Sequence, residues 1–324
     1  MNGPRTLQEA IIYFADYANC HAAMVAVRWP GGVVKCPRCG SDRVVYLDNA
    51  RVWKCYEKHP LAKFSLKVGT VFEDSPLPLQ KWLPALWLLT NCKNGISSYE
   101  LARALKVTQK TAWFMLQRLR LALQQGVGGG KLNGTVEADE TYIGGRSRNM
   151  HSEKRARFGS LKGRSHTGKA VVMALLDRRG KRGVSQVRTE VIKNVRREHI
   201  HGTINKHVEV GATLYSDKLR SYNGLSDNYL HGVVDHAERY VDGQIHTNSC
   251  ENFWSLLKRS IKGTYVSIEP FHLFRYLDEQ AFRFNGRKGN DSDRFQRVME
   301  QVSGRRLTYT ELTGKSLAEG DTSH

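Results

Sequence analysis

Three acidic side chains stand where they could support metal-dependent chemistry on a phosphodiester. Asp139 lies in the stretch VEADETYIGG, Asp217 ends a short apolar run, and Glu251 lies near the start of a late helical segment. Carboxylates that converge from separate elements can hold two Mg²⁺ ions, which prefer oxygen ligands. Two such ions can activate an attacking oxygen and stabilise the leaving one. We predict that these three acids are catalytic and bind Mg²⁺ or Mn²⁺.

Basic side chains follow Glu251 on the same predicted helix. Lys258 comes seven residues later, which is about two helical turns, so both side chains share one face. Arg259 and Lys262 flank this lysine. Such a face could hold DNA phosphate against the metal ions. We predict that Lys258 is catalytic and that Arg259 and Lys262 bind DNA.

Glu251 has one alternative role and one competitor. Asn248 could cap the helix, with Glu251 as the third residue of a capping box. A carboxylate engaged in that way would not be available to a metal ion. Asn248 could instead contribute its side-chain oxygen to the metal site, so the third member of the set is open between these two residues.

The other two acids also have alternatives. Asp217 could be a turn residue in the sequence Ser216-Asp217-Lys218. Asp139 could be a charge neutralised by a nearby lysine or arginine, with Glu137 or Glu140 as the metal ligand in its place. Glu137 would share the strand face of Asp139, whereas Glu140 would face the other way.

A second group of metal-ligating residues lies near the N-terminus. Cys36 and Cys39 form a Cys-x2-Cys knuckle, and Cys55 follows after fifteen intervening residues. A four-cysteine ribbon would have its fourth ligand at position 58, which here is Lys58; the next residue, His59, completes a Cys-x3-His pair. This spacing suits tetrahedral Zn²⁺. We predict a structural zinc ribbon, with free thiols and a loop histidine as the alternative.

Composition indicates a polyanionic partner. The chain has 324 residues, 50 lysines and arginines against 31 acids, and a net charge of +19. A protein this basic is typical of nucleic-acid binding. No stretch approaches the roughly 20 apolar residues of a membrane span, and the N-terminus lacks the pattern of a signal peptide. We expect a cytoplasmic, nucleoid-associated protein with no membrane partner.

Two short helices between residues 97 and 125 are predicted to bind DNA. Ser97 or Ser98 would cap the first and Thr108 the second, after a tight turn. This arrangement is typical of a helix-turn-helix, although an ordinary helical hairpin with a solvated basic face would show the same pattern. The second-helix positions expected to be exposed and to meet DNA are Gln109, Lys110, Thr111, Phe114, Gln117 and Arg118.

A basic loop follows the first acidic strand. Gly126 to Gly130 form a flexible joint and the best domain boundary, and residues 144–168 are densely basic. We expect Arg146 and Arg148 in this loop to bind DNA phosphates. A solvated loop without a ligand is the alternative.

The remaining elements position the three acids. Strands are predicted at 135–143, 169–177, 184–192 and 212–216, a helix at 197–207, a further strand around 233, and helices from about 248 and after Pro270. We expect the element order three strands, helix, strand, helix, strand, helix, in which the helix between the strands at 212–216 and around 233 is assigned no residues. That order resembles the ribonuclease-H-like fold, a mixed sheet flanked by helices.

The chain as a whole resembles bacterial insertion-sequence transposases of the DDE class, in the branch with an N-terminal zinc ribbon (ISXO2-like transposases). The stretches that carry this resemblance extend from about residue 20 to about residue 290. They are RWPGGVVKCPRCGS, FSLKVGTVFEDSPLPLQKWLPALWLL, VEADETYIGG, LYSDKLRSY, HTNSCENFWSLLKRSIKGTY and FRYLDEQAFRFN. The ribbon departs from the commoner four-cysteine form at Lys58.

The resemblance implies an α+β multidomain chain and a transposition activity. It implies Mg²⁺-dependent cleavage of 3′ ends at terminal inverted repeats, strand transfer into double-stranded target DNA, and a homo-oligomer on the paired ends. The expected segments are an N-terminal helical segment 1–32, a zinc ribbon 33–75, a helix-turn-helix region 76–128, a ribonuclease-H-like DDE catalytic domain 129–290 and a C-terminal tail 291–324. The alternatives are a non-catalytic DNA-binding regulator and a stand-alone metal-dependent nuclease.

Overall fold

The chain divides into two compact units. A computed structural model describes residues 3–124, 130–144, 168–178, 183–234 and 245–314. One unit comprises Met1–Gln124 with Gly289–His324, and the other comprises Gln125–Lys288. In the part of the chain that is described, no single helix is long and apolar enough to cross a membrane; the first two helices pass that test only as a pair bent by 103°.

The first unit is built on a central apolar helix. Its helices are α1 (Leu7–Ala15), α2 (Tyr17–Arg28), α3 (Leu79–Asn91), α4 (Ser98–Leu105), α5 (Gln109–Leu123), α10 (Asp291–Met299) and α11 (Tyr309–Thr313). Buried residues lie on all sides of α3, among them Trp82, Leu86 and Trp87, which is typical of a core helix. Helices α1 and α10 pack against it. The expected N-terminal helical segment contains two helices, because Asp16 caps α2 immediately after α1 ends.

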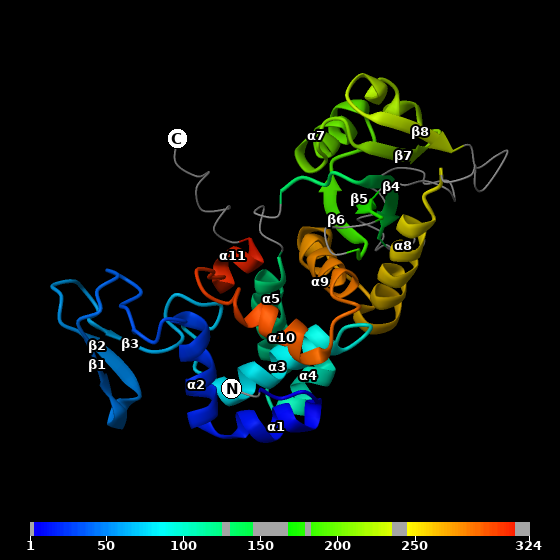
Figure 1. Cartoon of the computed structure of the whole chain (residues 1–324). Coiled ribbons are helices and arrows are strands. Elements are labelled where there is room, and N and C mark those ends of the chain that lie inside the picture. The colour runs from blue at the N-terminus through cyan, green and yellow to red at the C-terminus, as the bar shows by residue number, and fades with distance from the viewer. Residues whose placement is uncertain (1–2, 125–129, 145–167, 179–182, 235–244, 315–324) are drawn as a thin grey trace, which may run out of the picture. The chain divides into compact units, whose positions relative to one another are not determined.

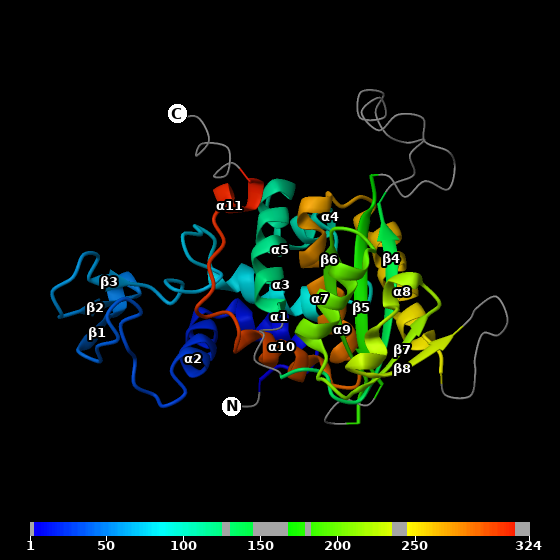
Figure 2. The same ribbon diagram turned by 90° about the horizontal axis from the view of Figure 1, so that it is seen from above.

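The C-terminal residues belong to this unit. Arg305 donates hydrogen bonds to the backbone carbonyls of Leu121 and Gln124 at the end of α5. Further on, the ring of Tyr309 in α11 meets the ring of Phe114 in α5 edge-on, with centroids 5.7 Å apart. Figures 1 and 2 both show α11 beside α5. The sequence assigns 291–324 only as a C-terminal tail; the structure shows that residues 291–314 pack on the helices of the first unit.

The predicted helix pair is present with the predicted caps. Ser97 and Glu100 form a complete capping box at the start of α4. Thr108 accepts a hydrogen bond from the backbone N–H of Thr111 at the start of α5. The turn between the helices is short because Lys106 adopts a left-handed conformation with φ 50°.

A small antiparallel sheet precedes α3. Its strands are β1 (Val44–Leu47), β2 (Val52–Cys55) and β3 (Lys63–Phe64), in the order β1-β2-β3, with a 3-10 turn η1 (Asp48–Ala50) between the first two. Trp53 of β2 is buried and packs between Phe64 and His21, at ring centroid distances of 5.8 and 5.3 Å. Aromatic rings therefore make up much of the apolar packing around this sheet.

The second unit contains a five-stranded mixed sheet. Its strands are β4 (Thr135–Ile143), β5 (Ala170–Asp177), β6 (Gln186–Ile192), β7 (Thr213–Asp217) and β8 (Leu230–Val234), in the order β6-β5-β4-β7-β8 (Figure 1). Strands β6, β5 and β4 are antiparallel, while β7 pairs parallel with both β4 and β8. Strand β4, which carries Asp139, is therefore the central strand of the sheet.

Helices cover both faces of this sheet. Helix α7 (Arg197–His207) contributes Ile200 and Ile204 to one apolar cluster. Helices α8 (Asn248–Ser260) and α9 (Leu273–Asn285) contribute Phe253, Leu257 and Leu277 to a second cluster with the alternate residues of β5. A single π-helical turn (Ile261–Tyr265) extends α8, and a 3-10 turn η7 (Pro270–His272) leads into α9.

One predicted element differs. The expected order places a helix between the fourth and fifth strands. Residues 218–229, all of which the structure describes, instead form two 3-10 turns, η4 (Arg220–Tyr222) and η5 (Leu225–Asp227). Gly224 between the two turns has φ 84°, a left-handed conformation that interrupts helical propagation.

Candidate functional site

Asp139 and Asp217 lie side by side on parallel strands. The β4–β7 register pairs Thr135 with Thr213 and Glu137 with Tyr215. Continued by two residues, this register places Asp139 level with Asp217, the last residue of β7. Since side chains alternate along a strand, both carboxylates point to the face of the sheet that α8 covers.

Asp139 is held by two donors. The indole N–H of Trp254 in α8 donates to Oδ2 at 2.9 Å, and the backbone N–H of Glu140 donates to Oδ1 at 2.9 Å. Burial raises the pKa of Asp139 to about 6; the charges of Asp217 and Glu251 act in the same direction, and the Trp254 hydrogen bond acts against it. Asp217 and Glu251 are thus each close enough to repel the charge of Asp139, and a bound cation would relieve that repulsion.

Glu251 lies in the first turn of α8, on its exposed side. The helix begins at Asn248 with Thr247 as the cap residue, so Asn248 is already helical and does not start a capping box. The backbone N–H groups of Ser249 and Cys250 bond to Glu137 instead. The alternative role of Glu251 in a capping box is therefore wrong, and Asn248, exposed one turn earlier, stays the alternative third ligand.

The acids are more widely spread than the ligands of a single ion. Among the described residues, the acids do not form a group whose ligand atoms all lie within 4.8 Å of one another, as the zinc ligands do. Two ions about 3.5–4 Å apart distribute their ligands over a longer span. The carboxylate chemistry and the mutual repulsion fit divalent cations of the magnesium type.

Glu137 faces the same way as Asp139 but is engaged by protein groups. Its side chain is wholly buried and its Oε1 accepts a bond from the guanidinium of Arg178 at 2.6 Å. Its Oε2 accepts the two α8 amides, at 2.9 and 3.0 Å. This carboxylate therefore already has its partners, which argues against the alternative that it replaces Asp139 as a ligand.

Glu140 faces the opposite side of the sheet. The hydroxyl of Tyr222 in η4 donates a hydrogen bond to its Oε1. Burial raises the pKa of Glu140 to about 8, and the charges of Asp217 and Asp139 add to this effect. Since Glu140 faces away from α8 and Glu137 is engaged by protein donors, Asp139 is the acid of this strand that can act together with Asp217.

The predicted basic residues of this helix are exposed. Lys258 and Arg259 lie in the last turn of α8, and Lys262 lies in the π-helical turn that follows. Lys258 shares the exposed side of the helix with Glu251. The surface is therefore available for phosphate contacts.

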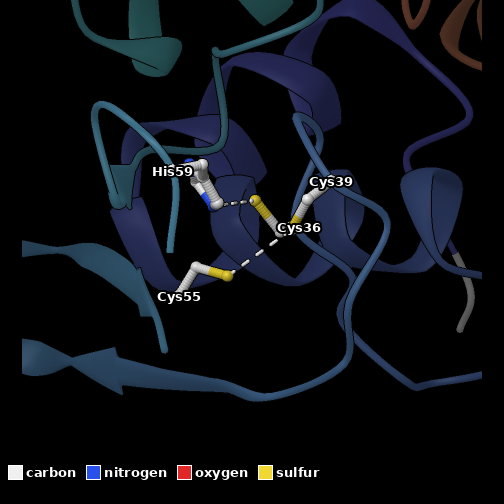
Figure 3. Close-up of side chains that lie close together, drawn as sticks. All are labelled: Cys36, Cys39, Cys55 and His59. Carbon is white, nitrogen blue, oxygen red and sulfur yellow. Dashed lines mark hydrogen bonds between the residues drawn. The ribbon is translucent and has the colours of Figure 1, made fainter. Parts of the chain in front are cut away.

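The cysteine and histidine residues converge in the first unit. The ligand atoms of Cys36, Cys39, Cys55 and His59 all lie within 4.8 Å of one another. Cys36 Sγ is 3.5 Å from His59 Nε2, and the sulfurs of Cys39 and Cys55 are 3.6 Å apart (Figure 3). Tetrahedral zinc with bonds of about 2.3 Å to sulfur has sulfurs about 3.8 Å apart. The donor set and its spacing fit Zn²⁺, with His59 as the fourth ligand.

Two further features favour metal binding at this site. The Nδ1 atom of His59 lies 2.8 Å from the carbonyl oxygen of Pro60, a contact that directs Nε2 toward the sulfurs. Burial by itself raises the pKa of the Cys36 thiol, but hydrogen bonds from the backbone N–H groups of Arg38 and Cys39 and from the thiols of Cys39 and Cys55 together bring the pKa down to about 7. A thiolate is the form that binds zinc.

The predicted DNA-binding surface of α5 needs correction. Gln117 and Arg118 are buried, so the expectation that they are exposed is wrong. Arg118 donates to the carbonyl of Glu73, and its guanidinium lies over the rings of Trp82 and Phe114. A long side chain with an apolar stem can be buried when its charged end has partners, which a helical pattern does not reveal.

The first turns of α5 keep more exposure. Lys110 is exposed, and its ammonium group lies 5.3 Å from the ring centre of Tyr309. Gln109 is half-buried and donates to the hydroxyl of Ser98, while Thr111 bonds with Thr108. The predicted contacts of Arg146 and Arg148 lie outside the described residues.

Sequence reasoning missed Trp254 and Arg178 and gave Glu137 no role. The indole lies three residues after Glu251, so an aromatic donor one turn beyond a helical acid was the available signal. Arg178, just after β5, could have been suspected as a partner for an acid in the neighbouring strand. Nothing in the sequence indicates that the partners of Glu137 include the amides of α8.

Comparison with known proteins identifies the family. Residues 131–285 match the ISXO2-like transposase domain, and residues 16–57 match the transposase zinc-ribbon domain. A protein of Halobacterium salinarum, described as an uncharacterized protein in transposable element ISH50, is 30% identical over 244 residues, which cover 73% of this chain and 80% of that protein. The chain belongs to the ISXO2-like insertion-sequence transposases and carries their zinc ribbon.

Proposed function

We propose that this transposase cleaves DNA 3′ ends at the terminal inverted repeats of its element and joins them to target DNA with Mg²⁺ or Mn²⁺. The observation that supports this best is the level placement of Asp139 and Asp217 on parallel strands, with Glu251 close enough to raise the pKa of Asp139. The sheet order and the helices on both faces support a ribonuclease-H-like fold for this unit.

The side chains of this unit have distinct roles in the proposed reaction. Asp139, Asp217 and Glu251 present carboxylate oxygens from a central strand, its neighbour and a helix. Trp254 and the Glu140 amide orient the two oxygens of Asp139. Lys258 holds a DNA phosphate on the exposed side of α8. The bound divalent cations supply activation of the attacking oxygen and stabilisation of the leaving oxygen.

The first unit is proposed to recognise DNA. The zinc ribbon and the α4–α5 pair, which we propose as a helix-turn-helix, belong to a chain with a net charge of +19. We assign DNA contacts to Lys110, Gln109 and Thr111 at the start of α5, and not to the buried Arg118. Because two element ends are joined in one event, we also propose that the active form is a homo-oligomer on paired ends.

The acids are tested with asparagine variants in a joining assay. Asp139→Asn and Asp217→Asn remove the charge and keep the side-chain volume, so we expect cleavage and joining to fall below detection. Asp227→Asn is the control, because Asp227 is an exposed acid of η5 in the same unit. Full joining by either site variant would contradict the proposal.

The products separate the other two classes of function. Specific DNA binding with neither cleavage nor joining by the intact protein would indicate a regulator. Cleaved ends that are never covalently linked to target DNA would indicate a nuclease. Covalent joining that depends on added Mg²⁺ is the expected result.

A further inference from the structure

We infer that Glu137 is a positioning residue that fixes α8 against β4 and thereby places Glu251 beside Asp139. This inference rests on the proposed function, because it concerns how that site is assembled. Glu137 is wholly buried at the centre of the sheet. A buried carboxylate is strongly unfavourable unless charged groups and hydrogen-bond donors surround it.

The contacts of Glu137 supply those partners from two directions. Arg178 pairs with Oε1 from the end of β5 at 2.6 Å. On the other side, Oε2 accepts the backbone N–H groups of Ser249 and Cys250. These amides belong to the first turn of α8, where N–H groups have no partner within the helix and where a negative charge is favoured. Glu137, a strand residue, therefore accepts the hydrogen bonds that the side chain of an N-cap residue usually accepts at the start of a helix.

Arg178 extends the same arrangement to the segment before the helix. Its guanidinium donates to the carbonyl oxygen of His246 at 2.7 Å and lies 2.8 Å from Nδ1 of that ring. It also lies over the ring of Tyr215, at 4.9 Å from the ring centre. The ion pair of Arg178 and Glu137 therefore holds both the segment before α8, through His246, and the first turn of the helix.

A second connection fixes the helix one turn later. Trp254 bonds to Asp139, which is two residues beyond Glu137 on the same face of β4. Two strand residues span about 6.6 Å, and the four residues from Cys250 to Trp254 rise about 6 Å. Because these lengths match, the bond from Cys250 to Glu137 and the bond from Trp254 to Asp139 can form at the same time. Together they fix the position of α8 along β4 and its rotation about the helix axis. Glu251 lies between them along the helix.

The test measures binding of Mn²⁺ by the full-length, zinc-containing protein, through the loss of the free-ion paramagnetic resonance signal. In Glu137→Gln the shape is kept, but the amide cannot accept from both α8 amides and from Arg178 at once. We expect Mn²⁺ affinity to fall at least tenfold, as is typical when a residue that orients a metal ligand is changed. Circular dichroism and zinc content should match the wild type.

Four further variants accompany this measurement. Glu190 is another strand carboxylate that bonds to a helix, since it contacts Lys206 and His207 of α7 at 3.0 and 2.8 Å. Glu190→Gln should therefore leave Mn²⁺ binding unchanged. Glu251→Gln should weaken binding, and adding Glu137→Gln to it should weaken binding no further. Glu137→Asp, which keeps the charge but shortens the reach, should fall between Glu137→Gln and the wild type.

Each outcome decides between the two proposals. Folded Glu137→Gln with wild-type Mn²⁺ affinity would overturn the positioning role. Loss of folding in both Glu137 variants would overturn it as well, because Glu137 would then be needed for the fold itself. The proposed function fails instead if the wild type does not bind Mn²⁺, or if Asp139→Asn binds it as the wild type does.

Discussion

The indole N–H of Trp254 donates a hydrogen bond to Oδ2 of Asp139 at 2.9 Å. This contact joins a helix to the central strand of the sheet across 115 residues of sequence. It leaves the acid with one donor on each oxygen, because the Glu140 amide occupies Oδ1. A carboxylate held in this way has a fixed orientation, which is what a metal ligand requires.

Replacing Trp254 with phenylalanine should impair the site, because it frees one oxygen of Asp139 and removes a donor that lowers the pKa of this acid. Trp254→Phe keeps an aromatic ring in the apolar cluster but removes the donor to Asp139. We expect the Mg²⁺ concentration that supports half-maximal cleavage to rise about tenfold. Trp82→Phe is the matched control, because it removes an indole bond to Ser75 in the first unit. An equal shift in both variants would show a general effect on folding.

The third member of the acid set can be assigned by two substitutions. Glu251→Gln should abolish cleavage, while Asn248→Ala should retain most of it. Glu251 is exposed, and the first-turn amides of α8 bond to Glu137 and not to Glu251. The free energy of unfolding of Glu251→Gln should therefore differ from that of the wild type by less than about 0.5 kcal/mol. Near-normal cleavage by Glu251→Gln together with inactive Asn248→Ala would assign the role to Asn248.

The fourth zinc ligand can be tested with neighbouring residues. His59→Ala should lower the zinc content from one ion per chain to less than half, because His59 supplies the only nitrogen of the Cys36, Cys39, Cys55 and His59 cluster. Lys58→Ala should retain the full ion, although position 58 is where the four-cysteine form has its ligand. Metal analysis of the purified variants gives the answer. Retained zinc in His59→Ala would point to another ligand.

Two basic residues of α5 should behave in opposite ways. Arg118→Ala should destabilise the first unit by about 2 kcal/mol, because the half-buried Glu73 carbonyl loses a charged donor that is itself buried. Lys110→Ala should leave stability unchanged and weaken DNA binding, with a smaller dependence of affinity on salt. Thermal unfolding and titrations with inverted-repeat DNA at several salt concentrations measure both. A stable Arg118→Ala protein with weakened DNA binding would restore the original prediction for that residue.

Local patterns predicted many of the elements. The strand at 135–143 and the helix at 197–207 are present with the predicted bounds, and Ser97 and Thr108 cap the helices that they were expected to cap. These features depend on alternation, helical periodicity and cap chemistry, all of which act over a few residues. The predicted helix between β7 and β8 is absent from residues 218–229, where turn formation around Gly224 prevails.

Burial of polar side chains could not be obtained in the same way. Arg118 carries a charge and occupies a helical position that looked exposed, yet it is 3% exposed. Its partners come from the loop at Glu73 and from α3, far away in the sequence. Hydrophobic periodicity reports which face of a helix is apolar, and it does not report which charged residue finds buried partners.

The sequence by itself determined the acid-bearing strand, the zinc-ligand spacing, the basic charge and the resemblance to a transposase family, because each is written in adjacent or regularly spaced residues. Only the tertiary structure decided which acid of VEADETYIGG lies beside Asp217, and that Glu137 binds the start of α8 while Glu140 binds Tyr222. The physical reason is that a carboxylate's role depends on the donors around it. Those donors come from strands and helices about 40 to 115 residues distant, brought together only when the sheet and its helices pack.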